Sequence, residues 1–117
     1  SKSIKYETLF VPGALEIGTA IKLIHDKTSY QSFDGFVALG CIIRGETYHF
    51  EIVSNESARA LNELSLKYSL PIGNGILTVE NKDQALKRSD PIGLNKGGGA
   101  VSACLSLLDI KHNFINE

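Results

Sequence analysis

The sequence predicts an α/β protein, with helices covering both faces of a parallel sheet in a three-layer sandwich. Short apolar runs alternate with amphipathic segments along the chain, which is typical of parallel βα units. Residues 35–43 are apolar without alternation, as in a central strand covered on both faces. The 117 residues suffice for one domain, 1–117, and 43% hydrophobic against 21% charged residues favours a packed core.

The first half of the chain predicts two strands and two helices. "TLFVPG" (8–13) is expected to be a short strand that ends at Pro12 and Gly13. A helix follows, with apolar residues at helical spacing: Ala14, Ile17, Ala20, Ile21 and Ile24. After the strand at 35–43, a longer helix is predicted over 48–68. Its apolar stripe contains Phe50, Val53, Ser57, Leu61, Leu64 and Tyr68.

The second half predicts a third strand and two more helices. Residues 72–80 form the strand, and Asn81 with Gln84 resembles a capping box for a short helix through Arg88. Residues 89–99 are expected to be a loop because they hold a proline and several glycines. The last helix is expected from about 100 to 111. Its inward side chains would be Val101, Cys104, Leu105 and Leu108.

Charge and cysteine usage exclude several classes of protein. The net charge is −1, and no basic stripe of the kind that binds nucleic acid is present. No apolar run approaches the roughly 20 residues that span a bilayer, and the N-terminus lacks the pattern of a signal peptide. Cys41 and Cys104 lie in apolar surroundings, which favours buried thiols in a reducing compartment. We therefore expect a cytoplasmic protein that binds neither nucleic acid nor membrane.

"GCIIRGETYHFE" (40–51) places reactive side chains where a strand ends and a helix begins. Ligands of open parallel sheets bind beyond the carboxyl ends of the strands. At that position, the turn from Arg44 to Thr47 and the helix N-terminus could hold an anion such as phosphate without a metal. His49 would lie within reach of the molecule that carries the phosphate, and histidine is suited to moving protons near neutral pH.

Each of these residues also has an ordinary structural interpretation. His49 could serve on the surface or in packing, Arg44 could form a salt bridge, and Cys41 could be a core thiol. The remaining candidates are Glu16, which could complement a helix dipole or contact a ligand, and Arg88 and Lys96, which could be solvated charges. Taken alone, the pattern indicates a small site for an anionic ligand on an α/β domain.

Four stretches together resemble the lumazine synthase family: "VPGALEI" (11–17), "LGCIIRGETYHFEIVSNESA" (39–58), "PIGNGILTVENKDQALKR" (71–88) and "GLNKGGGAVSACL" (93–105). They occur in the family's order and spacing. The resemblance implies a flavodoxin-like fold around a four-stranded parallel sheet. It also implies a preceding strand and helix, with an aromatic residue that stacks on the pyrimidine, and these are absent from the 117 residues.

The resemblance implies condensation of 5-amino-6-(D-ribitylamino)uracil with 3,4-dihydroxy-2-butanone 4-phosphate to 6,7-dimethyl-8-ribityllumazine, without metal or organic cofactor. His49 matches the catalytic histidine, and Glu46 and Thr47 match the phosphate-binding turn. Residues that match the pyrimidine site are Ala14, Leu15, Glu16, Cys41, Ile42 and Ile43.

The resemblance further implies a homo-oligomer, as a pentamer, a decamer or a 60-subunit shell, with sites at subunit interfaces. Asn74 matches a neighbour's contact to the pyrimidine, Arg88 matches a neighbour's contact to the phosphate, and Lys96 matches a basic residue nearby. Riboflavin synthase is a possible partner. Two alternatives stay open: a self-assembling scaffold without activity, and a flavin-binding module of the same fold.

Overall fold

A parallel pair of strands forms the sheet in this structure, a computed structural model that describes residues 4–27 and 33–114. β1 (Phe36–Ile43) pairs with β2 (Ile72–Val79), and the register sets Phe36 beside Ile72 and Ile43 beside Val79. α2 (His49–Tyr68) connects the two strands. The predicted α/β class is therefore confirmed.

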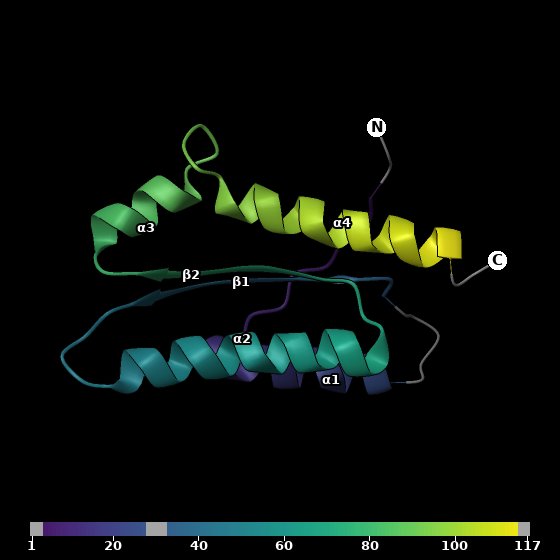
Figure 1. The fold of residues 1–117 in the computed structure, drawn as a ribbon, viewed down its shortest axis with the longest axis horizontal. Helices are drawn as coiled ribbons and strands as arrows, with labels where there is room; N and C mark the ends of the chain where they lie inside the picture. The colour runs from purple at the N-terminus through teal and green to yellow at the C-terminus, as the bar shows by residue number, and fades with distance from the viewer. Residues whose placement is uncertain (1–3, 28–32, 115–117) are drawn as a thin grey trace.

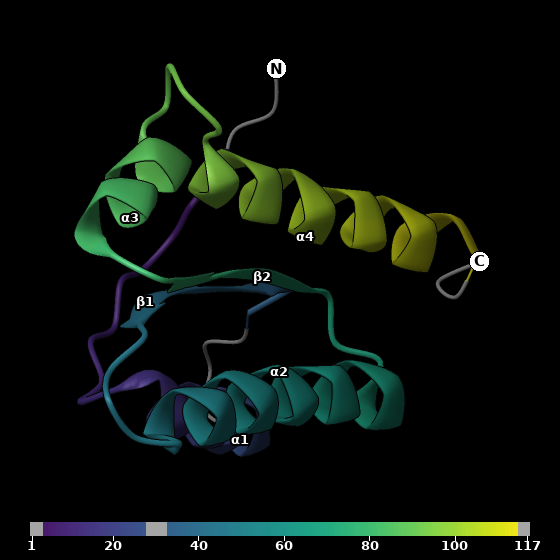
Figure 2. The ribbon, with the colours of Figure 1, turned by 60° about the vertical axis from the view of Figure 1, so that its left-hand side comes forward.

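Helices lie on both faces of this sheet, as predicted (Figure 1). α1 (Ile17–Asp26), which follows a short 3-10 turn, η1 (Ala14–Glu16), lies beside α2 on one face. α3 (Lys82–Ser89) and α4 (Lys96–Phe114) lie on the other face, and the view in Figure 2 shows the same three layers. No helix within the described ranges is both long and apolar enough to cross a bilayer.

The core lies between the sheet and the pair α1 and α2. Its buried residues are Ile21, Ala38, Leu61, Leu64, Leu70 and Ile72. Leu61 and Leu64 belong to the stripe predicted for α2, whose residues Val53 and Ser57 are also buried. Each fully buried aliphatic side chain contributes about 1.5–3 kcal/mol to folding. The apolar spacing therefore predicts correctly which side of α2 faces the sheet.

On the other face, α4 packs against β2 at two glycines. A Cβ atom added at Gly73 would lie 1.9 Å from the carbonyl oxygen of Ala100, and one at Gly75 would lie 3.0 Å from the Ala100 Cβ. Ala100 and Cys104 are buried by this contact. The absence of side chains at these positions of β2 sets how closely α4 approaches the sheet.

The strand predicted over 8–13 is wrong. Residues 8–11 have no regular secondary structure, and the side chains of Leu9 and Phe10 are 64% and 90% exposed. A strand is stable only when a neighbour satisfies its backbone, and among the described residues β1 pairs with β2 alone. The sheet consequently has two strands here instead of the three that the sequence predicts.

The prediction that β1 is covered on both faces is also wrong. Residues on its α1 and α2 side include the buried Ala38 and Ile42, whereas those on the α4 side are exposed: Val37, Leu39, Cys41 and Ile43. This follows because α4 lies over β2 and leaves much of this face of β1 open. The predicted burial is therefore correct for Cys104 and wrong for Cys41.

Two helix starts depend on asparagine side chains. Asn81 accepts a hydrogen bond from the backbone N–H of Gln84 at 2.9 Å, so the predicted cap of α3 is confirmed. α4 begins at Lys96, not near Ala100, because the Asn95 side chain accepts from the N–H of Gly98 at 3.2 Å. This cap extends the helix over three glycines, and Val101, predicted to face inward, is 41% exposed.

Candidate functional site

The turn after β1 lies at the carboxyl end of the sheet, as the sequence predicts. The backbone N–H of Arg44 donates to the carbonyl of Val79 at 2.9 Å, which continues the strand pairing by one residue. From Gly45 onward the chain leaves the sheet, and Glu46 and Thr47 are exposed. His49 is the first residue of α2 and is exposed as well. A ligand can therefore approach this turn directly.

The N-terminus of α2 has the features that bind anions. Thr47 Oγ1 accepts a hydrogen bond from the backbone N–H of His49 at 3.3 Å, while Tyr48, at the cap position, provides no side-chain cap. First-turn N–H groups without a side-chain cap and the positive end of the helix dipole both favour negative charge. The Thr47 hydroxyl lies beside these groups and adds a further donor. The arrangement fits a phosphate group that binds without metal.

Arg44 is held by two carboxylates and an aromatic ring. Its Nε donates to both carboxylate oxygens of Glu80, at 2.8 and 3.1 Å, and its Nη1 donates to Glu51. The guanidinium carbon lies 4.4 Å from the centre of the Phe50 ring. The prediction that Arg44 could form a salt bridge is confirmed, and in this structure its charge is already compensated.

These contacts change the acidity of both partners. The pKa of Glu51 is lowered, chiefly because Arg44 donates a hydrogen bond to its carboxylate. The pKa of Arg44 is raised, chiefly by the hydrogen bond to Glu51 and then by that to Glu80. Because the folded-state pKa of Glu51 is depressed, the ion pair is complete at neutral pH. It weakens only as the pH falls through that lowered value.

The segment predicted to hold the pyrimidine packs against the strand and the helix that flank the turn. Ala14, Leu15 and Glu16 form η1, which contacts both α2 and β1. Ala14 is half-buried, whereas Leu15 and Glu16 are exposed. At the end of β1, Ile42 faces the helices α1 and α2. Cys41 and Ile43 point to the open face.

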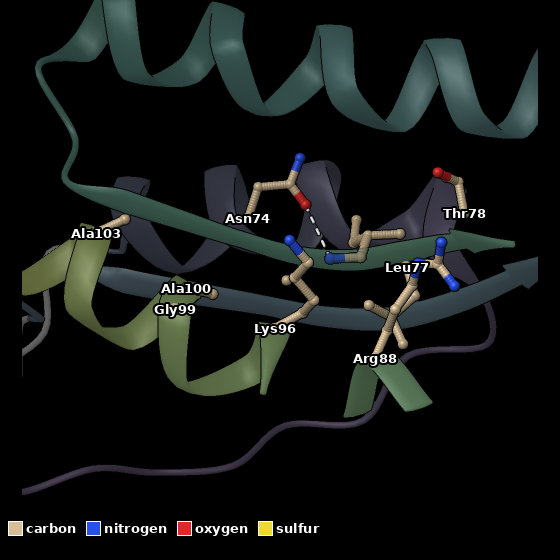
Figure 3. A pocket seen from close by; sticks show the side chains of 10 residues that line it. Asn74, Leu77, Thr78, Arg88, Lys96, Gly99, Ala100 and Ala103 are labelled. Carbon is tan, nitrogen blue, oxygen red and sulfur yellow. Dashed lines mark hydrogen bonds between the residues drawn. The ribbon is translucent and has the colours of Figure 1, made fainter. Parts of the chain in front are cut away.

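A second group of predicted residues lies along β2 (Figure 3). Asn74, Arg88 and Lys96 line a groove of about 390 Å³ between β2 and the helices α3 and α4. The Asn74 side chain accepts from the backbone N–H of Ile76 at 2.9 Å, which satisfies a donor of the strand. Arg88 Nη1 donates to the carbonyl of Gln84 at 3.4 Å. Both cations extend from helix ends toward the strand.

The fold places the predicted site residues in two separate groups. None of the residues on the turn, on η1 or at the end of β1 lines the groove beside β2. Thr47 precedes α2, whose first residue is His49, whereas Arg88 lies in the last turn of α3 on the opposite face of the sheet. One copy of the chain therefore holds the two groups of predicted site residues at separate places.

Sequence reasoning missed Glu80 and the role of Glu51. In the sequence, Glu51 is the last residue of the stretch 40–51, and Glu80 is the last residue of the strand predicted over 72–80. Glu51 reaches Arg44 from the first turn of α2, and Glu80 reaches it through the strand register, which brings the end of β2 beside the end of β1. The sequence carries no local signal for that pairing.

The donor set does not suggest a metal centre. Among the residues that the structure describes, no three histidine, cysteine, aspartate or glutamate side chains gather as metal ligands. A histidine beside a helix N-terminus can supply general acid–base catalysis and electrostatic stabilisation.

The fold and the turn define an α/β protein with an exposed helix N-terminus and an adjacent histidine at the carboxyl end of a parallel sheet. The family model described as 6,7-dimethyl-8-ribityllumazine synthase matches residues 1–112. The chain belongs to this family of enzymes.

Curated relatives support this assignment. A protein of Bartonella tribocorum is 54% identical over 109 residues, which cover 93% of this chain and 71% of the relative. A protein of Sphingopyxis alaskensis is 56% identical, over 93% of this chain and 74% of the relative. One of Agrobacterium fabrum is 55% identical, over 91% and 73%. All three are named 6,7-dimethyl-8-ribityllumazine synthase.

Proposed function

We propose that the protein condenses 5-amino-6-(D-ribitylamino)uracil with 3,4-dihydroxy-2-butanone 4-phosphate to form 6,7-dimethyl-8-ribityllumazine in riboflavin biosynthesis. The family and the names of its relatives support this activity. The observation that carries it is the placement of His49 at the start of α2, directly after the exposed turn with Glu46 and Thr47. One helix end thus combines an anion site with a proton-transfer group.

The turn and η1 would each take one substrate. Glu46 and Thr47, with the backbone at the start of α2, would hold the phosphate of the butanone. The pyrimidine would lie against η1, with Ala14, Leu15 and Glu16, and against the end of β1, with Cys41, Ile42 and Ile43. Both sets border α2, so the two substrates would meet next to His49. Holding two reactants in register is itself a large source of acceleration.

The reaction then follows from the positions of these groups. The pyrimidine amine attacks the ketone and loses water to form an imine. Removal of a proton from the adjacent carbon expels phosphate, and the resulting enol tautomerises before the second amine closes the ring with loss of water. His49 would carry these protons, and the helix N-terminus would stabilise the departing phosphate.

We also propose that the site is completed by a neighbouring copy, in a pentamer, a decamer or a 60-subunit shell. Asn74 would then approach the pyrimidine of the adjacent subunit, and Arg88 its phosphate, with Lys96 nearby. Support comes from the groove beside β2, which collects these residues away from His49. Riboflavin synthase, which would consume the product, is a proposed partner. A cytoplasmic location is supported by the two free thiols.

His49→Ala tests the proposed chemistry. We expect the rate of lumazine formation to fall by about 10²–10⁴-fold, because general acid–base catalysis contributes that much. The matched control is His25→Ala, which removes an exposed histidine in the last turn of α1 and should leave the rate unchanged. Nearly full turnover by folded His49→Ala protein would contradict the assigned role.

A further inference from the structure

The turn that carries the candidate phosphate site has almost no packing of its own. Residues 45–49 are all exposed, and no heavy atom lies within 4 Å of a Cβ atom built at Gly45. Inside the turn, the bond from the His49 N–H to Thr47 Oγ1 spans only two residues. Something outside the turn must therefore hold its position relative to the sheet.

Arg44 joins the two ends of this turn. It is the last residue before the turn, and its side chain binds Glu51 and stacks on Phe50, both in the first turn of α2. These contacts hold the two ends of the segment 44–51 together, and the segment contains Glu46, Thr47 and His49. A planar guanidinium can make such contacts in two directions at once.

Glu80 attaches this closed turn to the second strand. It binds Arg44 Nε through both carboxylate oxygens, and its own backbone N–H donates to the Gln84 side chain at 2.8 Å. Gln84 belongs to the first turn of α3, whose start is also fixed by Asn81. The position of the turn therefore depends on a chain of contacts through Arg44 to the end of β2 and to α3.

We propose that Arg44 is a positioning residue, which clamps the phosphate-binding turn and His49 in register by binding Glu51 and Glu80. This inference rests on the proposed function and deepens it. The alternative is that Arg44 binds the substrate phosphate directly. With two carboxylates on one guanidinium, however, the group of three carries a net negative charge at neutral pH, which is unfavourable for direct contact with a dianion.

We call the contacts of Arg44 with Glu51 and Glu80 the clamp. Removing them should lower the activity but change the stability of the fold little. The side chains of Arg44 and Glu80 are 41% and 55% exposed, and exposed ion pairs contribute little to folding. Misplacement of a catalytic group by about 1 Å can nevertheless cost on the order of 10²-fold in rate. Arg44→Gln and Glu51→Gln should therefore lower kcat while the midpoint of thermal unfolding changes little.

A matched control exists on the same helix. Arg59 also binds two carboxylates, Glu56 and Glu63, on the exposed side of α2 and away from the turn. Arg59→Gln removes an equivalent charge and an equivalent pair of contacts. It should leave kcat, KM and the turn unchanged.

The test compares Arg44→Gln, Glu51→Gln, their double variant and Arg59→Gln in steady-state kinetics with both substrates. The clamp predicts that each single variant lowers kcat by roughly tenfold or more, and that the double variant is no worse than the poorer single one. Full activity of Glu51→Gln, beside a raised KM for the phosphate substrate in Arg44→Gln, would overturn the proposal in favour of direct contact.

A second readout needs no turnover. Glutamyl endopeptidase should cleave the bond after Glu46 several-fold faster in Arg44→Gln and Glu51→Gln than in the unaltered protein or in Arg59→Gln, because the released turn fits a protease more readily. If the unaltered chain forms no lumazine, the proposed function fails, and cleavage alone decides on the clamp. Equal cleavage rates in all four proteins would overturn it.

Discussion

At the scale of single residues, the two thiols show how one sheet creates opposite environments. Cys104 is 5% exposed and its Sγ lies 3.6 Å from the carbonyl oxygen of Pro71. Burial is the main cause that raises its pKa above the ordinary value. Cys41, on the open face of β1, is exposed. Of the two thiols, a reagent in solution can reach only that of Cys41 without opening the fold.

Thiol labelling tests this difference. We expect N-ethylmaleimide to modify Cys41 in the native protein and to reach Cys104 only after denaturation, as followed by the mass of each labelled peptide. Cys41→Ser protein serves as the control and should take up no label until it unfolds. Rapid native labelling of Cys104 would contradict the burial of its side chain beneath α4.

The sequence predicted only those parts of the candidate site whose residues are close together along the chain. Thr47 and His49 lie between a predicted strand and the apolar stripe of a predicted helix, so their place at a helix N-terminus could be anticipated. The partners of Arg44 could not, because Glu80 comes beside it only through the register of β1 and β2. The roles proposed for Asn74, Arg88 and Lys96 rest on the family resemblance, since isolated polar or charged residues form no distinguishing pattern.

At the scale of elements, α4 packs closely against β2. Gly73 permits it, because any side chain there would occupy the position of the Ala100 carbonyl. By contrast, nothing lies within 4 Å of a Cβ atom built at Gly99, in the first turn of the same helix. Packing therefore requires a glycine at position 73 but leaves room for a side chain at position 99.

Substitution of these glycines should have opposite effects. Gly73→Ala should lower the free energy of unfolding by about 3 kcal/mol, because α4 or the strand must move to admit the methyl group. Gly99→Ala should raise it by about 0.5–1 kcal/mol through helix propensity. Urea unfolding of both variants measures the difference. Equal stability of the two would show that α4 does not approach β2 as closely as described.

Periodicity predicted the elements whose partners lie within the described chain. The stripe of α2 and the cap of α3 are local signals, and both are confirmed. The segment 8–13 has an apolar run of the same kind but no strand beside it, so its strand did not form. The start of α4 was missed because the Asn95 cap outweighs the low helix propensity of Gly97, Gly98 and Gly99.

At the scale of the whole molecule, large apolar side chains are left exposed on one side of the sheet. Leu39 and Ile43 on β1 are 61% and 48% exposed, and Phe10 lies open ahead of η1. The candidate site is divided in the same way, with His49 at one place and Arg88 in the groove beside β2. Sequence alone shows no such division, because it depends on which face of the sheet each helix covers.

The central claim is that each site takes His49 from one chain and Arg88 from its neighbour. Arg88→Ala alone should raise the KM for the butanone phosphate, because a cation that faces the phosphate is lost. His49→Ala alone should be nearly inactive.

Mixing the two variants tests the claim most directly. His49→Ala and Arg88→Ala chains are denatured together in equal amounts, refolded, and assayed for lumazine formation at limiting butanone phosphate. If neighbours share the site, random assembly restores both residues in about a quarter of the sites, and the mixture exceeds the mean of the two separate variants. A mixture whose activity equals that mean would contradict the shared site and place both residues in the site of a single chain.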